Sequence, residues 1–229
     1  NESQYNAGIN HFGFVIPLKS KNNMESSGNS LAFGFGYNKL RDFNGYSVMQ
    51  AVNSSNSLVD EFVYTANNYA DWDPFTDELA WETYLIDYDS LAGVYYSDFD
   101  ISGYGQTQRR TVETSGSIGE YLFTLGANLG HKLYVGGSLG IQSANYTETW
   151  THLETDPGDV IDYFNEFSFK NNLITTGRGL NVKLGFTARP MEWLRVGGAI
   201  HTPTFFKMND DFTSTMTTSL ADGEGAHVY

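Results

Sequence analysis

Four segments of the chain alternate between apolar residues and polar or very small ones, at 121–129, 133–142, 180–189 and 194–201. Successive side chains of a β-strand point to opposite faces, so this period predicts strands that each have one apolar face. The polar set of these segments contains Lys183, Arg189, Arg195 and His201. A Lys or Arg that faces lipid at mid-depth costs roughly 2–4 kcal/mol, so this sorting is typical of a membrane barrel. A soluble β-sandwich alternates in the same way, so the alternation leaves both architectures open.

Short connections join the predicted strands in pairs. Two further strands are expected at 10–18 and 31–37, joined by a polar link, and the later pairs are joined by turns at 130–132 and 190–193. The stretches between the pairs are long. Outer-membrane barrels have short periplasmic turns and long extracellular loops, and the chain follows this order. A sandwich has no reason to confine its long loops to one end, so the connections favour the barrel.

We therefore predict an all-β fold, a transmembrane antiparallel up-and-down β-barrel in a bacterial outer membrane, with residues 1–229 forming part of one barrel domain. Residues 42–104 are expected to form a long acidic extracellular loop insert with short helices, and residues 143–179 a second long extracellular hairpin or loop. Six strands cannot close such a barrel, because the smallest have about 8 and an open edge in lipid leaves backbone groups unpaired. We expect the sequence to be a fragment of a barrel that is completed by strands outside it.

Composition and charge exclude several other classes of protein. The chain contains 24 Gly and no Cys, so a disulfide framework and thiolate metal sites are excluded. The formal charge is −14, with 27 acidic and 13 basic residues. A nucleic-acid partner is excluded, because its binding requires a basic surface that displaces counterions from phosphates. No run of apolar residues is long enough for a transmembrane helix.

A stretch near the end of the chain resembles the FadL/TodX family of outer-membrane transporters, and in particular its members from Bacteroidota. The resemblance rests on Gly179–Phe186 (GLNVKLGF), Arg189-Pro190, Trp193–Gly197 (WLRVG) and His201–Phe205 (HTPTF). It implies a barrel of 14 strands, of which about six are present here, plugged by an N-terminal hatch. It also implies passive inward movement of long-chain fatty acids or other apolar compounds, from a groove among the extracellular loops to a lateral gap in the wall, without a cofactor. The hatch, with its Asn-Pro-Ala motif, and the C-terminal strands have no counterpart in this sequence, so the internal ligand pocket of the family is not carried over.

The 42–104 insert is the most acidic part of the chain. Between Arg41 and Arg109 there are 12 Asp and Glu residues and no Lys or Arg. One helix is predicted after Ser57 and another from Asp73-Pro74, because both carry helix-start signals followed by apolar residues at helical spacing. Such helices could hold an apolar ligand between them, or they could pack on each other and cover the barrel mouth. The candidate ligand contacts are Phe62, Val63, Leu79, Tyr84 and Leu85.

Other chemistry has weaker support in the sequence. The spacing of Asp71, Asp73, Asp77 and Glu78 resembles a calcium loop but lacks its glycine, so we predict no metal site and expect a solvated loop, with divalent cations linking it to lipopolysaccharide. His201 is followed by two Asp residues within ten positions, but a structural role is sufficient for it. We therefore predict no catalytic residue and no enzymatic activity.

Two functions from different classes remain. The first is passive transport of hydrophobic small molecules across the outer membrane. The second is a structural or adaptor role in a larger outer-membrane secretion or assembly complex, in which the long loops would hold other outer-membrane proteins. A simple aqueous porin is a third option that fits less well, since the polar set carries much Gly and little charge. The expected partners are outer-membrane lipid, lipopolysaccharide and a hydrophobic small molecule.

Overall fold

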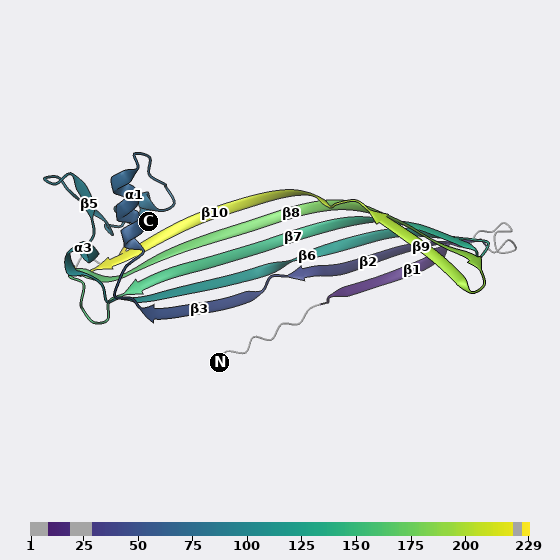
Figure 1. Cartoon of the computed structure of the whole chain (residues 1–229), viewed down its shortest axis with the longest axis horizontal. Helices are drawn as coiled ribbons and strands as arrows, with labels where there is room; N and C mark the ends of the chain where they lie inside the picture. The colour runs from purple at the N-terminus through teal and green to yellow at the C-terminus, as the bar shows by residue number, and fades with distance from the viewer. Residues whose placement is uncertain (1–8, 19–28, 222–225) are drawn as a thin grey trace. The chain divides into compact units, whose positions relative to one another are not determined.

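The computed structural model describes residues 9–18, 29–221 and 226–229 and is mainly antiparallel β-structure, which confirms the predicted all-β class (Figure 1). The strands are β1 (His11–Leu18), β2 (Ser30–Asp42), β3 (Gly45–Val52), β4 (Asp87–Asp89), β5 (Val94–Tyr96), β6 (Thr107–Leu129), β7 (Leu133–Thr155), β8 (Phe164–Met191), β9 (Leu194–His201), β10 (Phe205–Leu220) and β11 (Ala226–Val228). The helices are α1 (Val59–Asn68), α2 (Asp77–Glu82) and α3 (Asp98–Ser102). Within the described ranges, no helix has the length and apolar character needed to cross a membrane.

Nine strands form one sheet, and they contribute to two compact units. Hydrogen bonds connect the strands in the order β1-β2-β6-β7-β8-β10-β11, with β3 also paired to β6 and β9 also paired to β8 (Figure 1). β4 and β5 form a separate hairpin. Unit 1 comprises Asn1–Phe43, Gly116–Tyr146 and Thr175–Asp210. Unit 2 comprises Asn44–Ser115, Thr147–Ile174 and Asp211–Tyr229.

The strand register in unit 1 places the apolar residues of neighbouring strands on one face. Phe35 of β2 lies opposite Phe14 of β1 and opposite Phe123 of β6, with ring centroids 5.5 Å and 5.1 Å away. On β8 and β9, Leu184 lies opposite Ile200. Cross-strand aromatic and aliphatic pairs of this kind stabilise a sheet. A shift of one residue in any strand would move its apolar set to the other face, so the alternation itself specifies the register.

The turn between β6 and β7 explains how these two strands form a hairpin. Gly130 and His131 both have positive φ, at 61° and 56°, and the Lys132 N–H donates to the Leu129 carbonyl at 3.2 Å. Two consecutive residues with positive φ match the twist of the flanking strands. The short turn predicted at 130–132 is therefore confirmed.

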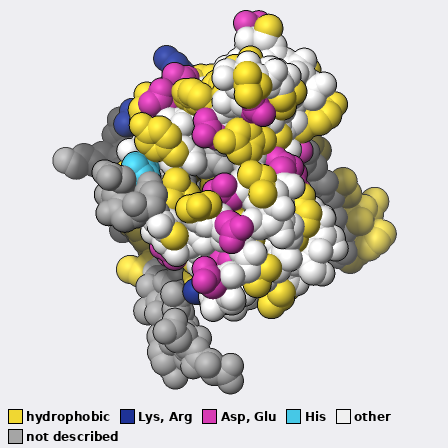
Figure 2. All heavy atoms as spheres, turned by 90° about the vertical axis from the view of Figure 1, so that its left-hand side faces the viewer, with side chains coloured by type: hydrophobic (Ala, Val, Ile, Leu, Met, Phe, Trp, Pro, Cys, Tyr) yellow, Lys and Arg dark blue, Asp and Glu magenta, His cyan; other side chains and the backbone are white. Residues whose placement is uncertain are grey.

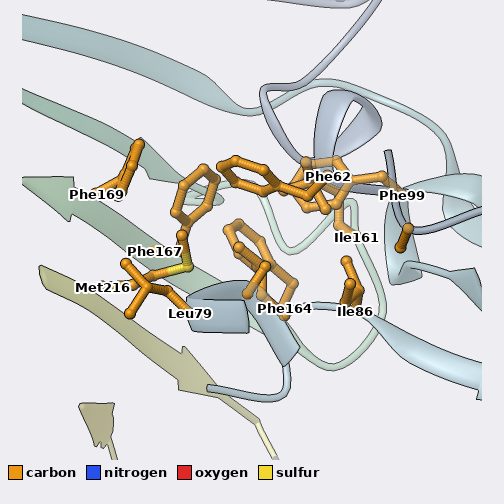
Figure 3. Packing of buried hydrophobic residues seen from close by; sticks show 13 residues of the cluster. Phe62, Leu79, Ile86, Phe99, Ile161, Phe164, Phe167, Phe169 and Met216 are labelled. Carbon is orange, nitrogen blue, oxygen red and sulfur yellow. The ribbon is translucent and has the colours of Figure 1, made fainter. Parts of the chain in front are cut away.

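The buried apolar residues of unit 2 form a hydrophobic core. α1 presents Val59, Phe62 and Ala66 to this core, which is the spacing of one helix face. Figure 3 shows Phe62 beside the phenylalanines that enter from the start of β8 and from α3. The core consists of Val59, Phe62, Ala66, Leu79, Ala80, Leu85, Ile86, Phe99, Ile161, Phe164, Phe167, Phe169 and Met216. The acidic insert is thus anchored by its apolar residues.

Several expectations about the elements need correction. The six predicted strands correspond to β1, β2, β6, β7, β8 and β9, but the described residues form nine strands of the main sheet. Of the two forms expected for 143–179, a hairpin or a loop, the structure has the hairpin, because β7 extends to Thr155 and β8 begins at Phe164. The polar run after His201 is β10, and β3 lies inside the acidic insert. Their apolar alternation is diluted by polar residues such as Asp210 and Ser214, and the strands are held by pairing with their neighbours.

Both predicted helices exist, with shifted starts. The Ser57 hydroxyl accepts the Val59 N–H at 3.1 Å, and the Ser57 N–H donates to Asp60 at 3.0 Å, so Ser57 assists the start of α1 as expected. In the second case, Asp73 accepts the Phe75 N–H at 2.9 Å in a turn, and α2 begins only at Asp77. The dipeptide Asp73-Pro74 therefore precedes the helix.

Gly116 offers a test of the backbone of unit 1. Its φ is 117°, and a Cβ atom there would lie 2.2 Å from the Asn145 carbonyl oxygen. We predict that Gly116→Ala lowers the free energy of unfolding by about 1–3 kcal/mol, because both the conformation and the close approach require glycine. Urea titration of the full-length protein by tryptophan fluorescence measures this. Gly126→Ala is the matched control, because no atom lies within 4 Å of its Cβ position; an equal loss in both variants would contradict the explanation.

Candidate functional site

The apolar face of unit 1 is exposed. Leu125, Leu184 and Ile200 have 55%, 56% and 72% of their surface exposed, and Ala144 is the only buried apolar side chain among the described residues of this unit. The other exposed members are Phe12, Phe14, Ile16, Leu18, Leu31, Tyr121, Phe123, Leu129, Val135, Leu139, Ile141, Leu180, Val182, Phe186 and Val196. A contiguous apolar surface of this extent is characteristic of a site that contacts lipid or another protein.

The opposite face of the same strands is lined by very small side chains, and we call it the glycine face. A hollow of about 830 Å³ lies on this face. One glycine from each of β2, β6, β7, β8 and β9 lines it, namely Gly34, Gly126, Gly136, Gly185 and Gly197. Because these residues carry no side chain, the space above the sheet stays open. Most of the remaining lining is apolar or hydroxylic. The hollow therefore suits a small, largely apolar molecule.

A buried carboxylate stands beside this hollow. Glu120 of β6 is 2% exposed, and each of its oxygens accepts a hydrogen bond from the Lys183 ammonium at 2.9 Å. Asn181 and Gln142 donate to the same carboxylate at 2.9 Å and 3.2 Å. A buried charge requires such partners, because an unpaired one would be strongly destabilising. Three strands thus contribute to one polar cluster on the glycine face.

The cluster fits only because position 140 is glycine. A Cβ atom on Gly140 would lie 2.5 Å from Glu120 Oε1 and 2.6 Å from Asn181 Oδ1. The Asn181 amide also donates to the Thr204 hydroxyl at 3.1 Å, which extends the cluster toward β10. Gly140 therefore makes room for a carboxylate and an amide that would otherwise collide with β7.

The strand that pairs with β8 is interrupted beside this cluster. Residues 202–204 separate β9 from β10, and Pro203 at their centre has no N–H to donate. The Thr202 N–H donates to the Val182 carbonyl at 3.0 Å, while the Val182 N–H donates to the Thr202 hydroxyl at 3.1 Å. A side chain thus replaces part of the backbone ladder at this point.

The four residues predicted to face the barrel lumen lie on or beside the glycine face. Lys183 and His201 are directly opposite each other on β8 and β9. Arg195 lies two positions before Gly197 on the same strand, and Arg189 donates to the Glu192 carbonyl at 3.3 Å in the β8–β9 turn. The structure brings only Lys183 into the Glu120 cluster. Whether this face borders a lumen remains a prediction.

The candidate ligand contacts of the insert are mostly core residues. Phe62, Leu79 and Leu85 are 2%, 4% and 5% exposed, and Val63 packs against the same core (Figure 3). Tyr84 is separate from them, being 65% exposed with its ring 4.9 Å from that of His227. The first four side chains therefore pack on one another, as the alternative reading of the insert expects. A ligand would have to displace them to bind there.

The surface of the insert mixes acidic and aromatic side chains. On the face shown in Figure 2, Asp and Glu side chains lie among hydrophobic ones, with few basic side chains. Asp77, one of the residues at calcium-like spacing, is buried and accepts the Asp73 N–H at 3.2 Å, so it supports the start of α2. Within the described part of the chain, no three His, Asp or Glu side chains converge in a way that could hold a metal ion.

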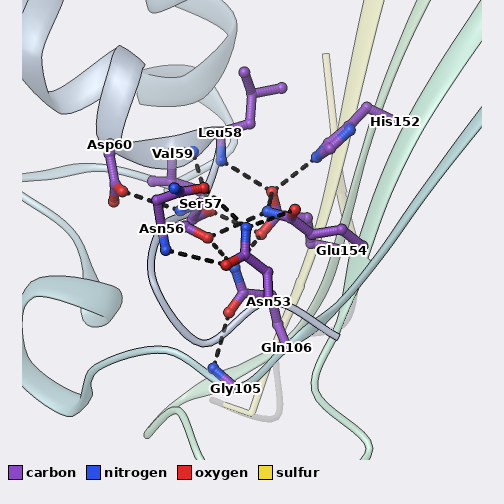
Figure 4. A network of polar contacts seen from close by, with 11 residues as sticks. Asn53, Asn56, Ser57, Leu58, Val59, Asp60, Gly105, Gln106, His152 and Glu154 are labelled. Atoms are coloured by element: carbon purple, nitrogen blue, oxygen red, sulfur yellow. Dashed lines mark hydrogen bonds and ion pairs between the residues drawn. The ribbon is translucent and has the colours of Figure 1, made fainter. Parts of the chain in front are cut away.

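A second buried carboxylate attaches the insert to the sheet within unit 2. Glu154 at the end of β7 accepts hydrogen bonds from the Ser57 hydroxyl at 2.8 Å and from the Leu58 N–H at 2.9 Å (Figure 4). Gln106 and Gln108 donate to it at 2.9 Å, and His152 lies 2.8 Å away. The start of α1 is therefore fixed to the strands through one side chain.

These contacts determine the ionisation of Glu154. Burial raises the pKa of Glu154, but the hydrogen bonds from His152, the Leu58 N–H and the Ser57 hydroxyl outweigh burial and hold that pKa below its ordinary value of 4.5. A carboxyl group whose pKa is lower in the folded state stabilises the fold above its ordinary pKa. That contribution disappears as the pH falls through the lowered pKa.

Sequence reasoning identified neither carboxylate. The position of Glu120 could have been noticed in the sequence. It directly precedes the alternating segment 121–129, and its side chain is expected on the polar face of that strand, the face that also carries Lys183 on β8. Glu154 carries no such signal, because most of its partners are 46 to 97 residues away in the chain. The two clusters hold side chains in place, and neither brings a nucleophile and a base together.

No family model, curated protein or solved structure matches the chain. The resemblance of the stretch from Gly179 to Phe205 to FadL/TodX transporters therefore stays a prediction. The functional argument rests on the two faces of unit 1.

The Glu154 cluster leads to a prediction about pH. We expect Glu154→Gln to weaken the attachment of α1 by about 1.5–3 kcal/mol at neutral pH, because hydrogen bonds to a charged acceptor are replaced by weaker ones. Hydrogen–deuterium exchange of residues 57–68 should be faster in the variant, and the difference should shrink as the pH falls below about 4. Glu166→Gln, at an exposed position of β8, is the control. A difference that persists unchanged in acid would contradict the role of the charge.

Proposed function

We propose that unit 1 is part of a transmembrane β-barrel in a bacterial outer membrane, and that the barrel passes hydrophobic small molecules by passive diffusion. The observation that carries the proposal is the exposed apolar face of unit 1, whose described residues bury only one apolar side chain, Ala144. In water, such a face would be strongly unfavourable, at roughly 25 cal/mol per Å² of apolar surface. Lipid chains would cover it, while the glycine face would border the lumen.

The length of the apolar segments supports this assignment. On each of three neighbouring strands, the segment with an apolar or glycine residue at every second position is nine residues long. These segments are Tyr121–Leu129, Leu133–Ile141 and Leu180–Ala188. A tilted strand needs about 9–11 residues to cross the hydrocarbon of a membrane. The strands β6, β7 and β8 continue well beyond these limits, but their apolar alternation stops. The apolar part therefore has the length of a membrane span rather than that of the strand.

Aromatic residues at one end of the apolar segments add to this support. Tyr37 and Tyr121 are the last apolar pair before the pattern ends, and their rings lie 5.1 Å apart. Phe12 lies 5.8 Å from Tyr37. Transmembrane barrels carry girdles of aromatic residues where the hydrocarbon meets the polar headgroups.

Passage of an apolar molecule is supported by the glycine face. The hollow of about 830 Å³ is lined largely by glycine and small apolar residues, and the wall beside it is interrupted at Pro203. The pairing between β8 and its neighbour is weakest there, because two hydrogen bonds between Thr202 and Val182 replace the regular ladder.

The direct test is uptake through the outer membrane. We expect cells that produce the full-length protein to take up the neutral fluorescent probe 1-N-phenylnaphthylamine faster than cells that do not. Gly126→Trp should abolish the gain, because a large side chain would fill open space in the hollow. Equal uptake by all three strains would contradict transport, and stoichiometric copurification with other envelope proteins would then favour the adaptor role.

The orientation of the two faces can be tested separately. We predict that Leu184→Arg destabilises the protein in lipid vesicles by about 2–4 kcal/mol, because the charge would face hydrocarbon. Thr187→Arg, on the glycine face of the same strand, should cost much less. Unfolding by urea in vesicles measures both. A larger loss for Thr187→Arg would reverse the assignment of the faces.

A further inference from the structure

The side chains that line the hollow carry one charge. Among the described residues of the lining, Lys183 is the only ionisable one apart from Tyr134, and its side chain is 38% exposed. A free ammonium in such a place would attract a carboxylate or phosphate on an incoming molecule. Whether the hollow prefers anions or uncharged molecules therefore depends on how this ammonium is paired.

The ammonium is already paired with an internal carboxylate. Both oxygens of Glu120 lie 2.9 Å from Lys183 Nζ. The pair is neutral as a whole, and the negative partner is the buried one. An incoming carboxylate would therefore meet a second carboxylate a few ångströms behind the ammonium, and the repulsion would offset the attraction.

The Glu120 carboxylate cannot easily move aside for a competing anion. Asn181 and Gln142 donate to it, and the space next to it exists only because Gly140 has no side chain. To release Lys183, Glu120 would have to remain buried and lose its charged partner, which is strongly unfavourable. An external carboxylate would thus have to replace an interaction that is already assembled and desolvated.

We propose that Glu120 and Lys183 make the hollow selective for uncharged apolar molecules, such as alcohols or hydrocarbons, over carboxylates of the same chain length. This inference rests on the proposed transport function and specifies its ligand class. Glu120 acts as the specificity-determining residue, because it neutralises the only basic group of the lining. Lys183 alone would favour the opposite class.

The test compares decanol with decanoate, which have the same chain length and differ in charge at about pH 8. Binding of each to the full-length protein in detergent is measured by calorimetry, and the ratio of the two affinities is compared between variants, so that partition into micelles cancels. We expect the native protein to favour decanol. Glu120→Gln should shift the ratio toward decanoate by about tenfold or more, the size expected for one released charge-assisted hydrogen bond.

A double variant keeps the test decisive if the single variant folds poorly. Glu120→Gln with Lys183→Met removes both charges, so it should retain the preference for decanol and gain no affinity for decanoate. Glu166→Gln, which removes a carboxylate at an exposed position of β8 outside the lining of the hollow, should leave the ratio unchanged. A native protein that binds decanoate as tightly as decanol would overturn the selectivity, as would an unchanged ratio in Glu120→Gln. Failure of the native protein to bind either compound would instead overturn the proposed transport function, and the inference with it.

Discussion

The exposed apolar face of unit 1 is the constraint on which the rest of the structure depends. Alternation at period two places Phe35, Phe123, Leu184 and their neighbours on the same side of the sheet, and the register cannot slip without moving a whole set to the other side. Unit 2 buries its apolar residues in a core that the acidic insert, the start of β8 and β10 build together. Unit 1 has no such core among its described residues. Its folding free energy must therefore come from a medium that covers the sheet, and lipid supplies that medium in our account.

The same constraint explains the residues of the opposite face. Where one face is covered by lipid, polar groups collect on the other, and glycine there leaves an open hollow instead of a packed core. The Glu120–Lys183 pair is a buried polar feature beside that hollow, and Gly140 provides the space for it. The Glu154 cluster is a separate device, because it fixes the start of α1 to the strands of unit 2 and has no part in the hollow. In our account the two buried carboxylates therefore serve two purposes, one in ligand selectivity and one in holding the insert.

The sequence predicted the strands with uninterrupted apolar alternation and missed the strands or parts of strands that are rich in polar residues. β6 was recognised only from Tyr121 onward, because residues 107–119 are polar on both parities and are held as a strand by β2 and β3. β10 does have an apolar set, with Phe206, Met208 and Phe212 on one face, but its many Asp, Asn and Thr residues led to its interpretation as a polar run. The helix after Ser57 was predicted from signals close together in sequence, although Leu58 and not Ser57 is its N-cap. The partners of Glu154, by contrast, are brought together only by the fold. Of the candidate ligand contacts in the insert, Phe62, Val63 and Leu79 lie on helices, while Tyr84 and Leu85 follow the end of α2. Apolar spacing cannot distinguish a groove from a core, and the structure places Phe62, Leu79 and Leu85 in one core.

Spin labelling in lipid vesicles tests the central claim most directly. The chain contains no cysteine, so a single Cys introduced at each position along β8 from 180 to 188 can be labelled uniquely. Our account predicts that labels at even-numbered positions, which share the apolar face with Leu184, are relaxed by oxygen, because oxygen concentrates in hydrocarbon. Labels at odd-numbered positions, which share the glycine face with Gly185, should be relaxed by a water-soluble nickel complex. The two profiles should alternate with a period of two. Equal exposure of both parities to the nickel complex would contradict the claim that lipid covers the apolar face.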